Sequence, residues 1–158
     1  MVDVHSKEIR SKNMRAIATQ QTAIEKQLAA LLTECGIPFR VQDSSLAGKP
    51  DFVLDSQRCI IFTHGCFWHR HHCYLFKMPA TRHEFWLNKL NTNVARDRRN
   101  IMSLIALGWR VLVVWECSLR WKKKLTQQAI MERLEEWVFS GVCHAEIDIY
   151  GIHQLASQ

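Results

Sequence analysis

Two cysteines and three histidines lie within the segment 66–73, which reads Cys66-Phe-Trp-His-Arg-His-His-Cys73. Thiolate and imidazole are ligands that Zn²⁺ prefers in proteins, usually in a tetrahedral set of four. Cys117 ends an apolar segment, and because the end of a strand can hold a side chain beside a loop, it is the natural distant ligand. We therefore expect a zinc site here. The spacing leaves open which histidine coordinates and which stays free for proton transfer, and a surface histidine run with incidental thiols is the alternative.

A second candidate site begins at Pro50-Asp51, where an extended segment opens, and includes Phe62-Thr63-His64 at the end of the next one. A carboxylate at the mouth of a hairpin, close to polar groups of the paired strand, can bind Mg²⁺ for phosphodiester hydrolysis. The arrangement resembles the PD-(D/E)xK nucleases, whose minimal fold runs helix, three strands, helix, strand. Their acidic-x-lysine sequence is absent here, and a Pro-Asp pair before a strand is also an ordinary turn.

The charge of the chain is positive and unevenly distributed. The 158 residues include 21 Lys plus Arg against 15 Asp plus Glu, a net charge of +6. Of these, 20 basic and 10 acidic residues precede Leu125, so this part carries +10 and the remainder −4. Such an excess, interleaved with aromatic residues, favours a polyanionic partner, most often nucleic acid, although a soluble enzyme with a high isoelectric point has the same charge.

The composition indicates one folded domain. Hydrophobic residues make up 47% of the chain, enough for one packed core, and the 6 Gly and 3 Pro exclude collagen-like and low-complexity classes. The longest apolar runs, 59–62 and 111–115, are too short to cross a bilayer, and residues 1–15 do not resemble a signal peptide. We expect a cytoplasmic protein without a membrane partner, in which Cys35 and Cys59 are reduced thiols.

Capping and turn residues divide the chain into elements that must position these side chains. Thr22-Ala-Ile-Glu25 fits a capping box that starts a helix, which Gly36 ends. Thr81-Arg-His-Glu84 fits a second capping box, and the long helix after it ends near Gly108. An amphipathic pattern predicts a last helix over 130–138. Extended segments are predicted at 38–41, 51–54, 59–63 and 109–115.

These elements predict an α/β fold, a single domain with a mixed central sheet flanked by helices. The segments 51–54 and 59–63 are expected to pair as a hairpin, and 109–115 to be a central strand buried on both faces. The irregular segment 65–79 is expected to be the loop that zinc ties. No element is predicted beyond Gly141. The chain divides into an N-terminal arm, a core and an acidic C-terminal tail, at 1–20, 21–140 and 141–158.

Five sequence motifs then occur in one order along nearly the whole chain, to about Gln154. They are Lys12-Asn-Met-Arg15, Arg40-Val-Gln-Asp43, Lys49-Pro-Asp-Phe52, Ile61-Phe-Thr-His-Gly-Cys-Phe-Trp-His69 and Gly108-Trp-Arg-Val-Leu-Val-Val-Trp-Glu-Cys117. Together they closely resemble the very short patch repair (Vsr) family of DNA mismatch endonucleases. The resemblance implies a restriction-endonuclease-like fold and an enzyme that nicks duplex DNA on the 5′ side of the thymine in T·G mismatches. Such mismatches arise when 5-methylcytosine deaminates, and the nick starts the repair.

The resemblance also implies roles for individual residues. Asp51 would be the essential magnesium ligand, with the main-chain carbonyl of Thr63 as another, and His69 the base that activates water in place of the missing lysine. The remaining members of the catalytic set would hold metal-bound waters: Glu25, His64 and Asp97. The structural zinc would have four ligands: Cys66, His71, Cys73 and Cys117. Without the resemblance, Glu25 reads as a capping residue and Asp97 as the partner of a neighbouring arginine.

The implied DNA contacts lie in two regions. Three aromatic side chains, Phe67, Trp68 and Trp86, would wedge into the base stack beside the mismatch, and the arm around Met14 would lie in the opposite groove. Trp86 as a core residue and Phe67 beneath the zinc are the structural alternatives. Basic side chains would contact phosphates without reading bases: Lys7, Lys12, Arg15, Arg96, Arg98 and Arg99.

Two rival functions follow from the same residues. A zinc-stabilised DNA-binding module without catalysis is favoured by the missing acidic-x-lysine, and a hydrolytic zinc enzyme would use the Cys/His cluster directly. The interpretation that we favour is a monomeric, magnesium-dependent endonuclease with a structural zinc. We expect it to act on T·G duplexes in the bacterial cytoplasm, at the nucleoid. Mismatch-repair proteins are its expected further partners.

Overall fold

A computed structural model of the protein describes residues 22–155. Residues 22–34 are helical. The other elements, in chain order, are strands β1 (Arg40–Val41), β2 (Phe52–Leu54) and β3 (Cys59–His64), helix α2 (His83–Ala106), strand β4 (Arg110–Trp115), helices α3 (Glu116–Leu119) and α4 (Gln127–Ser140), and strands β5 (Ala145–Asp148) and β6 (Gly151–Gln154). The expectation of a mixed α/β fold in a single domain is confirmed.

The six strands form one mixed sheet in the order β1-β2-β3-β4-β5-β6. β1, β2 and β3 are antiparallel to one another, which confirms the predicted hairpin, whereas β4 lies parallel to both β3 and β5. The β3–β4 register pairs His64 with Trp115, so both strands end at the same edge of the sheet. The segments that follow them therefore start side by side, and this brings Cys66 and Cys117 close together.

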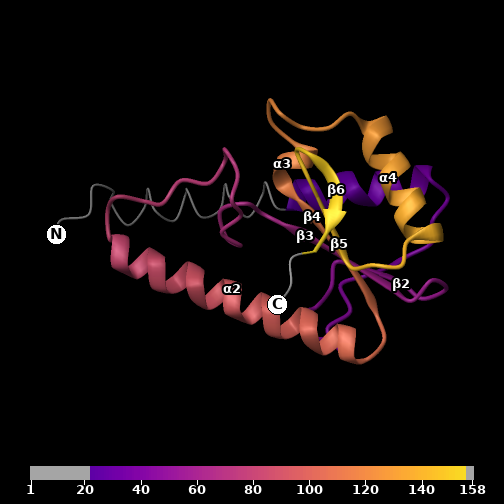
Figure 1. Ribbon diagram of the computed structural model, residues 1–158, viewed down its shortest axis with the longest axis horizontal. Helices are drawn as coiled ribbons and strands as arrows, with labels where there is room; N and C mark the ends of the chain where they lie inside the picture. The colour runs from indigo at the N-terminus through magenta and orange to yellow at the C-terminus, as the bar shows by residue number, and fades with distance from the viewer. Residues whose placement is uncertain (1–21, 156–158) are drawn as a thin grey trace.

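Helices cover both faces of the sheet, as Figure 1 shows with α2 on one side and α4 on the other. Alternate residues of a strand point to opposite faces. In β3, Ile60 and Phe62 pack with Ile101 and Leu104 of α2, while Ile61 packs with the opposite layer. That opposite layer contains the helix 22–34 and α4. The four inner residues of β4 are buried, as expected for a strand covered on both faces.

Helix α2 begins differently from the sequence expectation, and the prediction of a capping box at Thr81–Glu84 is wrong. The N-cap is Arg82, in the left-handed region at φ 56°, and it makes no side-chain capping hydrogen bond. Its guanidinium instead lies 4.3 Å from the centre of the Phe85 ring. The first turns of α2 extend beyond the sheet next to the loop that precedes the helix (Figure 1).

The C-terminal part of the chain holds more structure than the sequence predicts. α4 starts at Gln127, three residues before the predicted helix, because the Thr126 side chain caps it by accepting from the Ala129 N–H at 3.1 Å. β5 pairs with β4, and β6 closes the sheet as a hairpin with β5. The sheet thus continues into the segment 141–158, which the sequence predicts to be an acidic C-terminal tail. No helix between residues 22 and 155 has the length and apolarity to cross a membrane.

Candidate functional site

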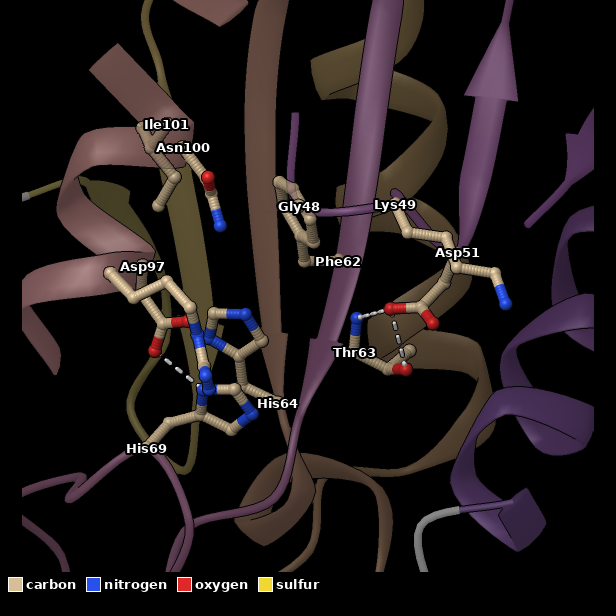
Figure 2. A pocket seen from close by; sticks show the side chains of 11 residues that line it. Gly48, Lys49, Asp51, Phe62, Thr63, His64, His69, Asp97, Asn100 and Ile101 are labelled. Carbon is tan, nitrogen blue, oxygen red and sulfur yellow. Dashed lines mark hydrogen bonds and ion pairs between the residues drawn. The ribbon is translucent and has the colours of Figure 1, made fainter. Parts of the chain in front are cut away.

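A pocket of about 380 Å³ opens where β3 ends, between the β2–β3 hairpin and α2. Its lining comes from four parts of the chain: Gly48, Lys49, Asp51, Phe62, Thr63, His64, His69, Arg96, Asp97, Asn100 and Ile101. Figure 2 shows Asp51 and Thr63 on one side, and His64, His69 and Asp97 on the other. The pocket therefore has a carboxylate side and an imidazole side.

On the carboxylate side, three hydrogen bonds hold Asp51. The main-chain N–H of Thr63 donates to Oδ2 of Asp51 at 2.7 Å, and the Thr63 hydroxyl donates to the same oxygen at 3.2 Å. The Gln42 amide donates to Oδ1 of Asp51 at 3.2 Å and to Oε2 of Glu25 at 3.1 Å. Gln42 thus joins two carboxylates from different elements. Glu25, Gln42 and Asp51, together with the turn residue Lys49, form one polar wall of the site.

The closeness of Glu25 and Asp51 changes the acidity of Glu25. Burial, together with the nearby charge of Asp51, raises the pKa of Glu25 to about 7. Two carboxylates that repel one another in this way are a donor set suited to a divalent cation, because a hard cation prefers oxygen ligands and cancels the repulsion. The residues present therefore fit a magnesium ion.

Replacing Glu25 by glutamine is expected to stabilise the protein in magnesium-free buffer at pH 8 more than at pH 5. Because the pKa of Glu25 is raised on folding from 4.5 to about 7, its stabilising protonated form is lost as the pH rises through 7. The variant's gain in the free energy of unfolding should be larger at pH 8 than at pH 5 by about 1 kcal/mol, because solvent screening weakens the effect at a partly exposed group. Urea unfolding at both pH values measures it.

The matched control is Glu34→Gln, which removes an exposed carboxylate from the end of the same helix. The Glu34 variant should show no such pH-dependent gain. If the Glu25 variant gains the same at pH 5 and pH 8, Glu25 is not the group that titrates near neutrality.

The imidazole side is built around His69. Its Nδ1 lies 2.6 Å from Oδ2 of Asp97, and its ring stacks on that of His64 with centres 3.7 Å apart and planes within 2°. Burial lowers the pKa of His64 well below its ordinary value, and the neighbouring histidines His69 and His71 act in the same direction. With Asp97 accepting from Nδ1–H of His69, the other ring nitrogen, Nε2, is the one that can take a proton.

His69 belongs to a different group of side chains from the cluster of thiols. The ligand atoms of Cys66, His71, Cys73 and Cys117 lie within 4.8 Å of one another, so the four side chains expected to bind zinc are brought together. Nδ1 of His71 lies 3.5 Å from Sγ of Cys66 and 3.7 Å from Sγ of Cys117. Three thiols and one imidazole suit a tetrahedral zinc ion. All six cysteines, which lie in the described part of the chain, are free of disulfides.

The thiols of Cys66 and Cys117 lie close enough to change each other's acidity, in opposite directions. A hydrogen bond from Cys66 lowers the pKa of Cys117 to about 5, with a smaller contribution from His71, whereas the same hydrogen bond raises the pKa of Cys66. The loop is also held from outside, because Glu116 accepts the main-chain N–H of Cys66 at 3.1 Å and the indole N–H of Trp121 at 3.0 Å. The site is thus fixed by neighbours that sequence reasoning did not single out.

The three aromatic residues predicted to contact DNA form one group beside the cluster. The ring centres of Phe67 and Trp68 lie 5.2 Å apart, and Trp86 lies 5.5 Å from Phe67 and 5.9 Å from Trp68. All three side chains are partly exposed. The Asn93 amide of α2 donates to the main-chain carbonyl of Trp68 at 3.2 Å and so ties the loop to the helix.

The remaining predicted residues fall into two groups. Arg96 lines the pocket, Arg98 lines an adjoining one, and Arg99 is exposed on α2. Met14, Lys7, Lys12 and Arg15 lie outside the described residues, as does the arm to which they belong. Asp97 forms its side-chain hydrogen bond with His69 and not with a neighbouring arginine.

Three polar residues of the pocket or its wall were not anticipated: Gln42, Lys49 and Asn100. Gln42 reaches both carboxylates from a left-handed backbone at φ 54°, which no sequence pattern signalled. Lys49 directly precedes Pro50-Asp51, so its place next to the carboxylate could have been expected. Asn100 follows Asp97 by three residues, which places both on one face of the helix.

Known proteins resemble this chain closely. A family model described as DNA mismatch endonuclease Vsr matches residues 2–75. The chain is 67% identical over 156 residues to a DNA mismatch endonuclease Vsr of Escherichia coli (strain K12), covering 99% of this chain and all of the relative. It is also 42% identical to the type II nicking enzyme V.XorIIP of Xanthomonas oryzae pv. oryzae, over 75% of this chain and 88% of the relative. The type II nicking enzyme V.NmeAIP of Neisseria meningitidis is 37% identical, over 76% of this chain and 86% of the relative.

Proposed function

Because the chain belongs to the Vsr family of DNA mismatch endonucleases, we propose that it nicks double-stranded DNA on the 5′ side of the thymine in a T·G mismatch. The mismatch would come from deamination of 5-methylcytosine, and the nick would initiate very short patch repair. One observation supports the catalytic part of this proposal above the others: Asp51 and His69 line a single pocket, each held by a second residue. A DNA-binding module without catalysis has no need of that arrangement.

The proposed metal site lies on the carboxylate side. Asp51 and the main-chain carbonyl of Thr63 would hold Mg²⁺, and Glu25 would hold water bound to it. When bound, the ion supplies positive charge that stabilises the phosphate oxygens in the transition state. Lys49 and Arg96 also line the pocket, and their positive charges suit a phosphate group.

The protein's own groups would manage the proton. His69 takes a proton at Nε2 from the attacking water, and the hydrogen bond between Nδ1–H and Asp97 keeps the ring in the required tautomer and orientation. His64, stacked against it, is kept neutral by burial and therefore adds no competing positive charge. This assigns Asp97 an orienting role in addition to the expected contact with metal-bound water.

The zinc ion is proposed to be structural. Cys66, His71, Cys73 and Cys117 would bind it, and four protein ligands leave no position open for substrate. By joining the loop after β3 to the segment after β4, the site would fix the loop that carries His69. The fold is proposed to be restriction-endonuclease-like, with divisions at 1–20 for the arm, 21–140 for the nuclease core and 141–158 for the C-terminal segment.

DNA recognition is proposed to use the aromatic group and the arm together. Phe67, Trp68 and Trp86 would insert beside the mismatch, where unstacking costs least because the pair is already weakened, and Met14 would lie in the opposite groove. Phosphates would be held by basic side chains on both sides: Lys7, Lys12, Arg15, Arg96, Arg98 and Arg99. We propose a monomer that works in the bacterial cytoplasm on nucleoid DNA and is assisted by mismatch-repair proteins.

The test is cleavage of a panel of end-labelled duplexes that differ only in one base pair and its neighbours. We expect a single nick 5′ of the mismatched thymine, at least about a hundredfold faster than in the paired duplex, which corresponds to about 3 kcal/mol of discrimination. The reaction should need added Mg²⁺. Binding without any nick would favour the non-catalytic module, and nicking with zinc alone would favour the hydrolytic zinc enzyme.

A further inference from the structure

The side of His71 that faces away from the thiols meets the C-terminal hairpin. Nδ1 of His71 faces Cys66 and Cys117, whereas Nε2 lies 3.9 Å from Oδ2 of Asp148 at the end of β5. That separation exceeds a typical N–H···O hydrogen bond by about 1 Å, a gap that a rotation of the ring or of the carboxylate would close. Asp148 is therefore the carboxylate toward which the second nitrogen of His71 points.

Asp148 is buried and held in place by its own hairpin. Only 7% of the residue is exposed. Its Oδ1 accepts the main-chain N–H of Tyr150 at 2.9 Å, and its Oδ2 lies 2.7 Å from Nε2 of His153 on β6. The β5–β6 turn and the facing strand thus fix the direction of the carboxylate. A buried carboxylate that is oriented in this way offers a preformed acceptor.

The plane of the His71 ring is fixed by the same hairpin. Trp115 stacks on His71 with ring centres 4.0 Å apart and planes within 6°. The indole N–H of Trp115 donates to Oε1 of Glu146 on β5 at 3.0 Å. Glu146 lies in the same group of potential ligands as His71 and Asp148. Asp148 is the better acceptor for the imidazole, because among the described residues its Oδ2 is the carboxylate oxygen within 4.0 Å of Nε2 of His71.

We infer that Asp148 is a positioning residue for the metal centre, which accepts a hydrogen bond from Nε2–H of His71 and so directs Nδ1 toward the thiolates. The inference rests on the proposed zinc site. A carboxylate behind a metal-bound histidine sets its tautomer and raises its basicity, and losing such a partner typically reduces metal affinity 10- to 100-fold. The hairpin β5–β6 is then a support of the metal centre and not only an edge of the sheet.

The experiment measures the zinc affinity of Asp148→Asn in the full chain by competition with a chromophoric chelator. Asparagine keeps the volume and can still accept from Tyr150, but it removes the charge that faces His71. We expect a loss of zinc affinity of about 10- to 100-fold, together with a shift of the visible absorption bands of the Co²⁺-substituted protein. The matched control is Asp55→Asn, which removes an exposed carboxylate paired with Arg40 far from the thiols.

Each outcome decides a separate point. An unchanged zinc affinity and cobalt spectrum in the Asp148 variant overturns the inference, even if the variant is less stable, because stability alone belongs to the hairpin. If wild type binds no zinc, the zinc proposal itself fails. Should the variant not fold, histidine-ring NMR of the zinc-loaded wild type decides instead: a protected Nε2–H on His71 supports the inference, and coordination through Nε2 overturns it.

Discussion

Replacing Asp51 by alanine is expected to abolish nicking of a T·G duplex, with a fall of about a thousandfold or more, while the affinity for that duplex stays within about threefold. Asp51 is the carboxylate that lines this side of the pocket, and the proposed magnesium ion loses its direct side-chain ligand once Asp51 is removed, because Glu25 is proposed to hold only metal-bound water. DNA binding is assigned to other residues, on the aromatic loop, α2 and the arm. Single-turnover cleavage and a gel-shift titration measure the two quantities separately.

Asp55→Ala is the matched control, because it removes a carboxylate from the far end of the same β2–β3 hairpin. Asp55 is exposed and pairs with Arg40, so its loss should leave the cleavage rate within about twofold of wild type. An Asp51 variant that cuts as fast as this control would remove the magnesium site from the proposed mechanism. An Asp51 variant that neither cuts nor binds would mean that the residue supports the fold.

Replacing His69 by alanine is expected to lower the cleavage rate by about 10²- to 10⁴-fold, the usual contribution of a positioned acid–base group. Asp97→Asn should have a smaller effect in the same direction, because the imidazole remains but the partner of Nδ1 loses its charge. Since Asp97 acts through His69, its substitution should also change how the cleavage rate depends on pH. Rates from pH 5.5 to 9 measure both effects.

His72→Ala is the control for this series, since His72 lies in the same loop and is exposed. It should retain nearly the full rate. If His69→Ala and His72→Ala behave alike, the proton is taken by another group, and the pairing of His69 with Asp97 serves only to hold the loop against α2. Restoration of the rate by added imidazole in the His69 variant would support its assigned role directly.

Much of the layered fold could be predicted because the elements near the site have strong local patterns. The buried strand 110–115 is nearly all apolar, and the hairpin of β2 and β3 is bounded by turn residues. The end of the sheet was harder to predict. β5 and β6 have four residues each and mixed polarity, and they become strands because β4 offers an unpaired edge. That edge exists only in the assembled fold.

The site divides in the same way. The thiols and histidines, and the candidate magnesium site at Asp51 and Thr63, could be identified from their types and spacing, and the family resemblance added Glu25 and Asp97. The partners of these residues could not be found, because they depend on backbone conformation and on elements distant in sequence. Gln42 reaches Glu25 and Asp51 from a left-handed backbone, and Arg82 starts α2 in the same unusual region where Thr81 looked like a cap.

The parallel pairing of β3 with β4 and the position of β5 beside them have a consequence for the timing of synthesis. The ribosome releases the chain from its N-terminus, so β5 and β6 are the last strands of the sheet to emerge. The loop with the aromatic group is made much earlier, and Cys117 follows His71 by 46 residues. A growing chain therefore displays that loop before its final support exists, and competence to cut DNA is deferred until the β5–β6 hairpin has been made.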